Sequence, residues 1–287
     1  GMPYYVFNFK DSFKAQVIDR FVEAYEKGIT PNPCIDCNRY MKFEKLYERA
    51  KLLGCDKLVT GHYARIEKQG EKYLLKKAVD LSKDQSYVLY SLNQEQLAHL
   101  LFPLGELQKT ETRKIAEAHG FINASKPDSQ DICFVPDGES AKFLTNEKSV
   151  GEEPGDFVDV NGKVLGKHNG IIHYTVGQRR GLGISADRSL YVIKIDKENN
   201  KVILGYEEDT LKNELVCKNV NWIIQKPKKE IAGKVKIRYN HQGELATIIP
   251  DGDNARVFFD KPVKSITPGQ MAVFYKDGYL IGGGVII

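Results

Sequence analysis

Apolar residues recur at helical spacing through the first half of the chain, and short extended runs separate these stretches. One apolar stripe predicts a helix that starts at Asp11 or Ser12 and stops at Gly28. Further helices are expected at residues 39–53, 94–101 and 111–119, the last capped by Thr110. Extended runs are expected at residues 57–60, 63–67 and 72–76, the first as a short buried strand. This alternation predicts an α/β layer with a parallel sheet.

The predicted α/β layer is short of strands. Only about two candidates for parallel strands precede Thr60, fewer than an ordinary open sheet contains. The extended run at residues 4–9 begins abruptly. We therefore expect the layer to be incomplete, with a part of it preceding Gly1.

After about residue 140 the pattern changes to hairpins. Asn161-Gly162 and residues 198–200 each separate two short extended runs. From residue 216 onward five short alternating strands follow one another, and Asp277-Gly278 forms the last tight turn. Strands of this length and number predict a small barrel or sandwich.

Composition adds few constraints. No apolar run approaches the roughly 20 residues of a membrane-spanning helix, and the first residues lack the features of a signal peptide, so a cytoplasmic protein is expected. The net charge of +4 is mild, but the stretch from Thr210 onward holds 12 Lys and Arg against 7 Asp and Glu. That excess suits a surface that faces RNA phosphates, and equally a solvated surface rich in lysine.

The cysteines raise the question of reactive thiols. Five cysteines without a secretion signal argue against a structural disulfide framework. Cys34 and Cys37 lie in a segment held by Pro31 and Pro33, just before the helix predicted from Arg39. At that position a helix N-terminus would lower the pKa of a thiol. A reactive thiol is favoured over a zinc site, which lacks a second cysteine pair, over a thioredoxin-like motif, and over two cysteines without a role.

A second cysteine stands in an irregular polar segment. Cys133 lies between Ile132 and Phe134, within the proline-bounded stretch 126–136. Irregular segments of this kind are often functional, but the apolar neighbours also suit simple packing. Three further stretches have polar groups suited to RNA or phosphate: Gly61-His62 after a predicted strand, residues 83–86, and residues 173–183. Their alternatives are a structural histidine, a solvated turn and a charged loop.

Together these segments resemble the tRNA-specific 2-thiouridylases, the MnmA family. The matching stretches occur in family order at residues 28–38, 60–65, 83–87, 101–106, 131–134, 174–184 and 267–275. The resemblance implies an incomplete adenine-nucleotide alpha-hydrolase-like α/β domain at residues 1–140, which would be a partial ATP-pyrophosphatase catalytic domain. A central mostly-β domain at 141–208 and a C-terminal β-barrel at 209–287 would follow it.

The resemblance also implies a sulfurtransferase mechanism. In this family ATP, with Mg as its usual counter-ion, adenylates the C2 oxygen of the wobble uridine of tRNA. A cysteine desulfurase or a persulfide relay protein would load sulfur on Cys133, and Cys37 would be the partner thiol. The cycle would end in a Cys37–Cys133 disulfide that a reductant reopens.

Other roles carry over by position. Asn32, Pro33 and Cys34 match the stretch that contacts the target base, and Gly61 matches a position at the ATP site. The positions that match tRNA contacts are His62, Lys83, Asp84, Gln85, Arg238, Tyr239 and Gln270. No metal ligand set is implied, and a monomer is the expected state.

Two departures from the family pattern bear on activity. The family's phosphate-binding sequence Ser-Gly-Gly-x-Asp-Ser does not occur in this chain, so we expect that the chain alone does not bind ATP productively. Cys34 stands where some relatives carry aspartate. The alternatives are a non-catalytic tRNA-binding paralogue or fragment, an ATP-pyrophosphatase that thiolates another base, and a zinc-binding RNA module.

Overall fold

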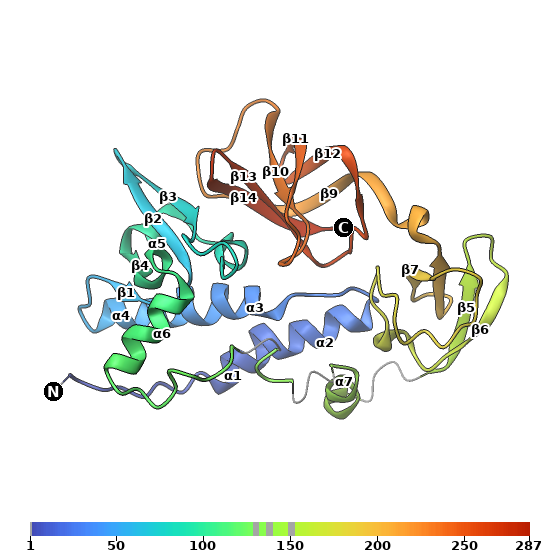
Figure 1. Ribbon diagram of the computed structural model, residues 1–287, viewed down its shortest axis with the longest axis horizontal. Coiled ribbons are helices and arrows are strands. Elements are labelled where there is room, and N and C mark those ends of the chain that lie inside the picture. The colour runs from blue at the N-terminus through green and yellow to red at the C-terminus, as the bar shows by residue number, and fades with distance from the viewer. Residues whose placement is uncertain (1, 129–131, 136–139, 149–152) are drawn as a thin grey trace.

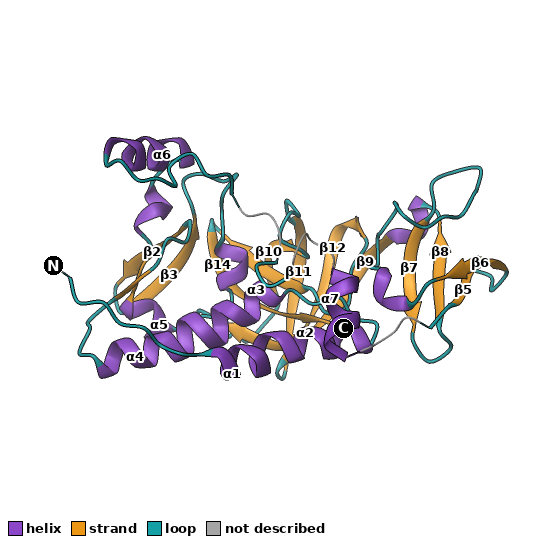
Figure 2. Cartoon of the chain, turned by 90° about the horizontal axis from the view of Figure 1, so that it is seen from below, coloured by secondary structure: helices purple, strands orange, loops and turns teal. Residues whose placement is uncertain are grey.

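The computed structural model describes residues 2–128, 132–135, 140–148 and 153–287 (Figure 1). A layer of helices from the first half lies along one side of a β-barrel, and a separate small sheet lies beyond the barrel (Figures 1 and 2). In the part of the chain that is described, no helix has both the length and the apolar character needed to span a bilayer.

The first helix follows the predicted apolar stripe. It runs without a break through α1 (Lys10–Phe13), a π-helical segment η1 (Lys14–Ile18) and α2 (Asp19–Glu26). Val17, Phe21 and Val22 are buried along it. Gly28, with φ of +68°, ends the helix as expected, because a left-handed residue there suits glycine. The predicted start was late, since Phe9 occupies the N-cap position.

The second helix begins six residues earlier than Arg39, at Pro33. It consists of α3 (Pro33–Asp36), the π-helical η2 (Cys37–Leu46) and α4 (Tyr47–Leu52). Pro33 occupies the first helical turn, where the missing N–H has no intrahelical acceptor and the fixed φ suits the helix. The prediction of a loop around Cys34 and Cys37 was therefore wrong: both cysteines are helical.

The parallel sheet of the first half is small. β1 (Leu58–Val59) pairs in parallel with β4 (Leu100–Leu101). Val59 is 55% exposed, so the expectation of a buried strand was wrong. The helix predicted at 94–101 ends early, as α5 (Gln94–His99), because Leu100 turns into β4. α6 (Lys109–Ala118) starts after Gln108, whose side chain forms a capping box with Glu111, so the cap predicted at Thr110 was wrong.

Three short helices complete the first part of the chain and its boundary with the middle. Two are 3-10 turns, η3 (Ser86–Leu89) and η4 (Pro103–Glu106). The third is α7 (Ser140–Lys148), which packs near α2.

The middle of the chain forms a four-stranded sheet of order β6-β5-β8-β7. Its strands are β5 (Gly155–Asp159), β6 (Val164–His168), β7 (Tyr191–Asp196) and β8 (Lys201–Gly205). The 3-10 turns η6 (Ile171–His173) and η7 (Glu207–Thr210) flank it. Within the stretch 173–183, Tyr174 and Leu182 pack into this sheet's core, whereas Arg179 and Arg180 are exposed.

The last part is a closed barrel of six antiparallel strands, because β13 and β14 pair with each other as well as with their other neighbours. The strands are β9 (Leu211–Trp222), β10 (Ile231–Lys236), β11 (Glu244–Asp251), β12 (Asn254–Lys264), β13 (Met271–Lys276) and β14 (Tyr279–Ile286). Asp277 and Gly278 both have positive φ, as the predicted tight turn requires.

The first half and the barrel share one core. The hairpin of β2 (Ala64–Gln69) and β3 (Lys72–Lys77) extends the barrel sheet, because β3 pairs with β14. Tyr87, fully buried, donates its hydroxyl to Met271 O at 3.0 Å, and Asn221 Nδ2 donates to Tyr90 O and Leu92 O. One buried cluster includes Ile35, Phe43, Leu75, Tyr87, Val273 and Leu280. The domain limits at 140 and 208 stay predictions.

A glycine of the barrel fits closely against the segment that precedes the cysteines. Gly269 has φ of +88°, and a Cβ there would lie 2.1 Å from Ile29 Cγ2 and 3.0 Å from Thr30 O. Gly252 also has positive φ, +54°, but a Cβ there would meet nothing within 4 Å. Substitutions at these two glycines can therefore distinguish the cost of a left-handed backbone from the cost of a steric clash.

We expect Gly269→Ala to lower the free energy of unfolding by roughly 1–3 kcal/mol more than Gly252→Ala. Both variants carry the left-handed penalty of about 1–2 kcal/mol, and only the first also displaces Ile29 and Thr30. Thermal and urea unfolding of the two variants measure the difference. Equal losses of unfolding free energy would show that Gly269 is not in close contact with Ile29 and Thr30.

Candidate active site

Most of the expected site residues line one cavity of about 530 Å³ between the helical layer and the barrel. Those that line it are Asn32, Pro33, Cys34, Cys37, His62, Gln85, Cys133, Tyr239 and Gln270. They come from six separate stretches of the chain. Gly61, Lys83, Asp84 and Arg238 are not among its lining residues.

The cavity brings together three of the five cysteines. Cys37 is half-buried, whereas Cys34 and Cys133 are exposed at the cavity, and all five cysteines are free thiols. Cys55 is exposed elsewhere, and Cys217 is buried in the barrel core, with its sulfur 3.6 Å from Ala255 O. Among the described residues, no group of three or more His, Cys, Asp and Glu side chains is placed to hold a metal ion.

Burial raises the pKa of the Cys37 thiol, and the neighbouring Cys133 and Asp36 raise it further. The positive charge of Lys42 opposes them by lowering that pKa. Burial likewise raises the pKa of Cys34. We expected Cys37 just before a helix, and that position was wrong because Cys37 lies within the helix. The positive charge that favours its thiolate comes from Lys42. Sequence reasoning missed Lys42, although it lies five residues after Cys37 in a π-helical segment, where that spacing returns to the same face.

The proline–cysteine segment is fixed by the barrel. Gln270 Nε2 donates to Thr30 O at 3.0 Å and to Pro31 O at 3.3 Å. The N–H of Thr30 donates to Pro268 O at 3.2 Å. These bonds satisfy carbonyls that precede the helix, so the cysteines are positioned from a part of the chain more than 200 residues away.

The segment around Cys133 is held by its apolar neighbours. Phe134 packs edge-on against Phe13 and Phe21, and Val135 is buried in a cluster with Phe21 and Leu144. The sequence left open whether this segment is functional or simply packed. Its apolar residues are packed, while Cys133 itself is exposed. Residues 129–131 and 136 of this segment, with Asp131 of the matched motif, lie outside the described residues.

His62 is a buried, neutral member of the cavity wall. Its Nδ1 lies 2.7 Å from Thr60 Oγ1, its Nε2 lies 3.4 Å from Lys42 Nζ, and its ring packs against Phe43 and Phe102. Burial, reinforced by Lys42, lowers its pKa to about 3. A neutral His62 cannot form an ion pair with a phosphate. Its contacts are those of a structural histidine, the alternative considered from the sequence.

Lys83, Asp84 and Gln85 hold the turn that carries them. Lys83 and Lys109 each form an ion pair with Asp128 at 3.0 Å, and Arg113 lies 3.8 Å from the same carboxylate. Lys109, followed by Lys83, lowers the pKa of Asp128 to about 2. Asp84 is buried and accepts hydrogen bonds from Ala78 N, Ser86 N and Ser86 Oγ. Gln85 Oε1 accepts from Tyr63 N.

The other expected residues lie around the cavity. Gly61, next to His62, is exposed. Arg238 donates to Lys264 O at 3.3 Å, and Tyr239, 37% exposed, follows it at the cavity rim.

Asn38 is a cavity residue that sequence reasoning did not single out. It is 3% exposed and follows Cys37 directly in the helix. Its Oδ1 accepts no hydrogen bond from any described residue. Leaving a buried amide oxygen unpaired costs about 1–3 kcal/mol, and such groups persist where a ligand supplies the partner. Only the adjacency to Cys37 in the sequence pointed to it.

Three family models match nearly the whole chain. Their descriptions are tRNA methyl transferase HUP domain over residues 1–137, tRNA methyl transferase PRC-barrel domain over 141–206, and aminomethyltransferase beta-barrel domain over 212–286. They confirm the predicted fold class of an α/β domain, a mostly-β middle and a C-terminal barrel.

Relatives with a named activity are similar over the full chain. The tRNA-specific 2-thiouridylase MnmA 1 of Thermoanaerobacter pseudethanolicus is 53% identical over 100% of this chain and 80% of its own length. The tRNA-specific 2-thiouridylases MnmA of Acetivibrio thermocellus and Clostridium acetobutylicum are 49% and 46% identical, each over 100% of this chain and 81% of its own length. The resemblance noted from the motifs thus extends along the whole sequence.

We expect Asn38→Leu to leave the free energy of unfolding unchanged or to raise it, since leucine has a similar volume and the substitution removes an unpaired buried amide oxygen. Asn221→Leu is the matched control: its amide makes two hydrogen bonds, so its loss should cost roughly 1–3 kcal/mol. Urea unfolding compares the two. A loss for Asn38→Leu as large as for Asn221→Leu would mean that the Asn38 amide is satisfied in the folded protein.

The pKa of His62 predicts a loss of stability in acid. Its folded-state pKa, about 3, lies below the ordinary value of 6.5, so the unfolded chain binds a proton that the folded protein excludes. The contribution of neutral His62 to the free energy of unfolding is fully present above pH 6.5. It is lost as the pH falls toward 3, at up to about 1.4 kcal/mol per pH unit. Urea unfolding between pH 7 and 5 should show a flatter pH dependence for His62→Phe. Parallel curves would contradict a neutral, buried His62.

Proposed function

The chain belongs to the tRNA-specific 2-thiouridylase (MnmA) family, and we propose that it replaces the C2 oxygen of the wobble uridine of tRNA with sulfur. The observation that carries this proposal is the shared cavity, where Cys37 and Cys133 lie on separately held segments beside the Asn32–Cys34 stretch. A reaction that passes sulfur from one thiol to a base and closes a disulfide with a second thiol needs this arrangement.

The two thiols have different surroundings that suit different tasks. Cys133 is exposed, so a cysteine desulfurase or a relay protein has access to load it as a persulfide. Cys37 is half-buried in a helix, where burial raises its pKa and Lys42 partly offsets that rise. We assign sulfur carriage to Cys133 and the attack that resolves the intermediate to Cys37.

The terminal sulfur of the Cys133 persulfide attacks the activated C2, and the activated oxygen leaves, which joins C2 to Cys133 Sγ through that sulfur. The Cys37 thiolate then attacks Cys133 Sγ. The bond between the two sulfurs breaks, 2-thiouridine leaves with the terminal sulfur, and the Cys37–Cys133 disulfide remains for an external thiol to reduce.

ATP supplies the activation of the C2 oxygen in this family, and we propose it as a co-substrate here. Gly61, the position that matches the ATP site, directly precedes His62 in the chain but does not itself line the cavity. The phosphate-binding sequence Ser-Gly-Gly-x-Asp-Ser does not occur in this chain, so no residue of the chain is assigned to the ATP phosphates.

Base recognition falls to the walls of the cavity. A uridine must leave its stack to reach a thiol between two domains, and the cavity offers Tyr239 for stacking and polar groups on Asn32, Asn38 and Gln85. The barrel residues Arg238, Tyr239 and Gln270 would then contact the anticodon arm from the other side.

We expect deletion of the gene to remove 2-thiouridine from cellular tRNA, and expression of the wild-type gene to restore it. Cys133→Ser and Cys37→Ser should each fail to restore it, because one removes the carrier and the other the resolving thiol. Cys55→Ser, at an exposed thiol away from the cavity, is the matched control and should restore it fully. Nucleoside mass spectrometry of tRNA hydrolysates is the measurement, and it separates thiolation from methylation by mass.

The same experiment distinguishes the two neighbouring thiols of the helix. Loss of activity in Cys34→Ser with retention in Cys37→Ser would move the resolving role to Cys34. Unchanged 2-thiouridine in the deletion strain, in the absence of a redundant enzyme, would reject the thiolation reaction and leave a non-catalytic tRNA-binding protein.

A further inference from the structure

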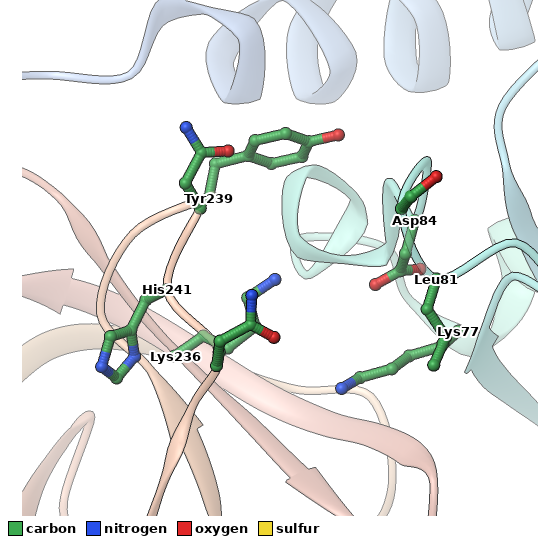
Figure 3. Close-up of a pocket in the computed structure, with 9 residues that line it drawn as sticks. Lys77, Leu81, Asp84, Lys236, Tyr239 and His241 are labelled. Atoms are coloured by element: carbon green, nitrogen blue, oxygen red, sulfur yellow. The ribbon is translucent and has the colours of Figure 1, made fainter.

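A second cavity, of about 200 Å³, lies between the β2–β3 hairpin and the barrel (Figure 3). The residues that matter in its lining are Lys77, Asp84, Lys236 and Tyr239. Lys77 ends β3 and Lys236 ends β10, so the two lysines come from facing elements (Figure 3). We call it the lysine cavity, and the cavity of Cys37 and Cys133 the cysteine cavity.

The lysine cavity carries an uncompensated positive charge. Neither Lys77 nor Lys236 forms an ion pair with any residue that the structure describes. Asp84, the one acidic side chain in the lining, already accepts three hydrogen bonds from Ala78 and Ser86. Two cations therefore face one carboxylate, and a monoanion would restore the balance.

The two ammonium groups are held in place and partly desolvated. Lys77 Nζ lies 4.6 Å from the ring centroid of Tyr275, and Lys236 Nζ lies 5.7 Å from that of Tyr87 and 5.8 Å from that of Tyr239. Both lysines are half-buried. Burial lowers the pKa of Lys236, Asp84 opposes this by raising it, and the repulsion from Lys77 lowers it further. Fixed, poorly hydrated cations bind an anion more strongly than freely moving surface lysines.

Tyr239 connects this cavity to the proposed site of reaction. It lines both the lysine cavity and the cysteine cavity. A nucleotide within a polynucleotide strand has the matching layout, with its base on one side of this side chain and its phosphate on the other.

We propose that the lysine cavity binds a backbone phosphodiester of the tRNA next to the uridine whose base enters the cysteine cavity. This inference rests on the proposed function. The phosphate would pair with Lys77 and Lys236 and would hold the flipped nucleotide while Tyr239 separates base from backbone.

The test measures binding of an anticodon stem–loop RNA by fluorescence anisotropy over a range of salt concentrations. Lys77→Met and Lys236→Met keep the length and the apolar stem while removing the charge. Each should weaken binding several-fold and reduce the slope of log K against log salt by about 0.7. Lys212→Met, at an exposed lysine of β9 without an ion pair to a described residue, is the control. We expect a smaller loss from it.

A second arm changes the RNA, so its main result is measured on the wild-type protein and does not depend on the folding of a variant. A neutral methylphosphonate is placed at each phosphate of the loop in turn. One that flanks the target uridine should weaken wild-type binding several-fold and should weaken the binding of Lys236→Met less, because that variant retains only Lys77 at the phosphate.

The outcomes separate the two proposals. If the wild-type protein binds the stem–loop but no flanking methylphosphonate weakens binding, the phosphate site is wrong and the thiolation reaction is untouched. If a flanking methylphosphonate and Lys236→Met weaken binding independently, the phosphate lies elsewhere. A wild-type protein that does not bind the stem–loop contradicts the proposed function itself.

Discussion

The structure depends on the joint between the barrel and the helical layer. The hydroxyl of Tyr87 donates to Met271 O within a core that both parts share. Gln270, the residue before Met271, donates to the carbonyls of Thr30 and Pro31. The same short stretch of barrel therefore closes a hydrophobic core on one side and positions the cysteine helix on the other. Neither part would place Cys37 without the other.

Different kinds of contact hold the two thiols in place. Cys37 belongs to a helix whose first turn is set by Pro33 and by bonds from the barrel. Cys133 belongs to a segment held mainly through Phe134 and Val135, whose contacts are apolar and not directional. A carrier that receives sulfur at the surface and a resolving thiol that stays in place can be built from these two kinds of support.

The motifs of the sequence predicted the fold class and the gathering of the cysteines, and several details could not follow from local pattern. Pro33 moved the helix start upstream, since proline is as compatible with a first turn as with a loop. Leu100 had apolar helical spacing but entered β4, because its partner is Leu58, far away in sequence. The unpaired Oδ1 of Asn38, the neutral ring of His62 and the charge of Lys42 at the cavity depend on burial, which a single sequence does not display.

The pairing of β3 with β14 has a consequence for how the chain reaches this structure. Leu75, in β3, is buried against residues of β13 and β14 that are synthesised about 200 residues later. Until those strands exist, the hairpin offers an unpaired edge and the helical layer exposes Tyr87 and its apolar neighbours. Folding of the first half is thus coupled to contacts of very high sequence separation, which are slow to form. During synthesis the first half therefore keeps this apolar surface exposed until β13 and β14 have been made, a condition that favours aggregation.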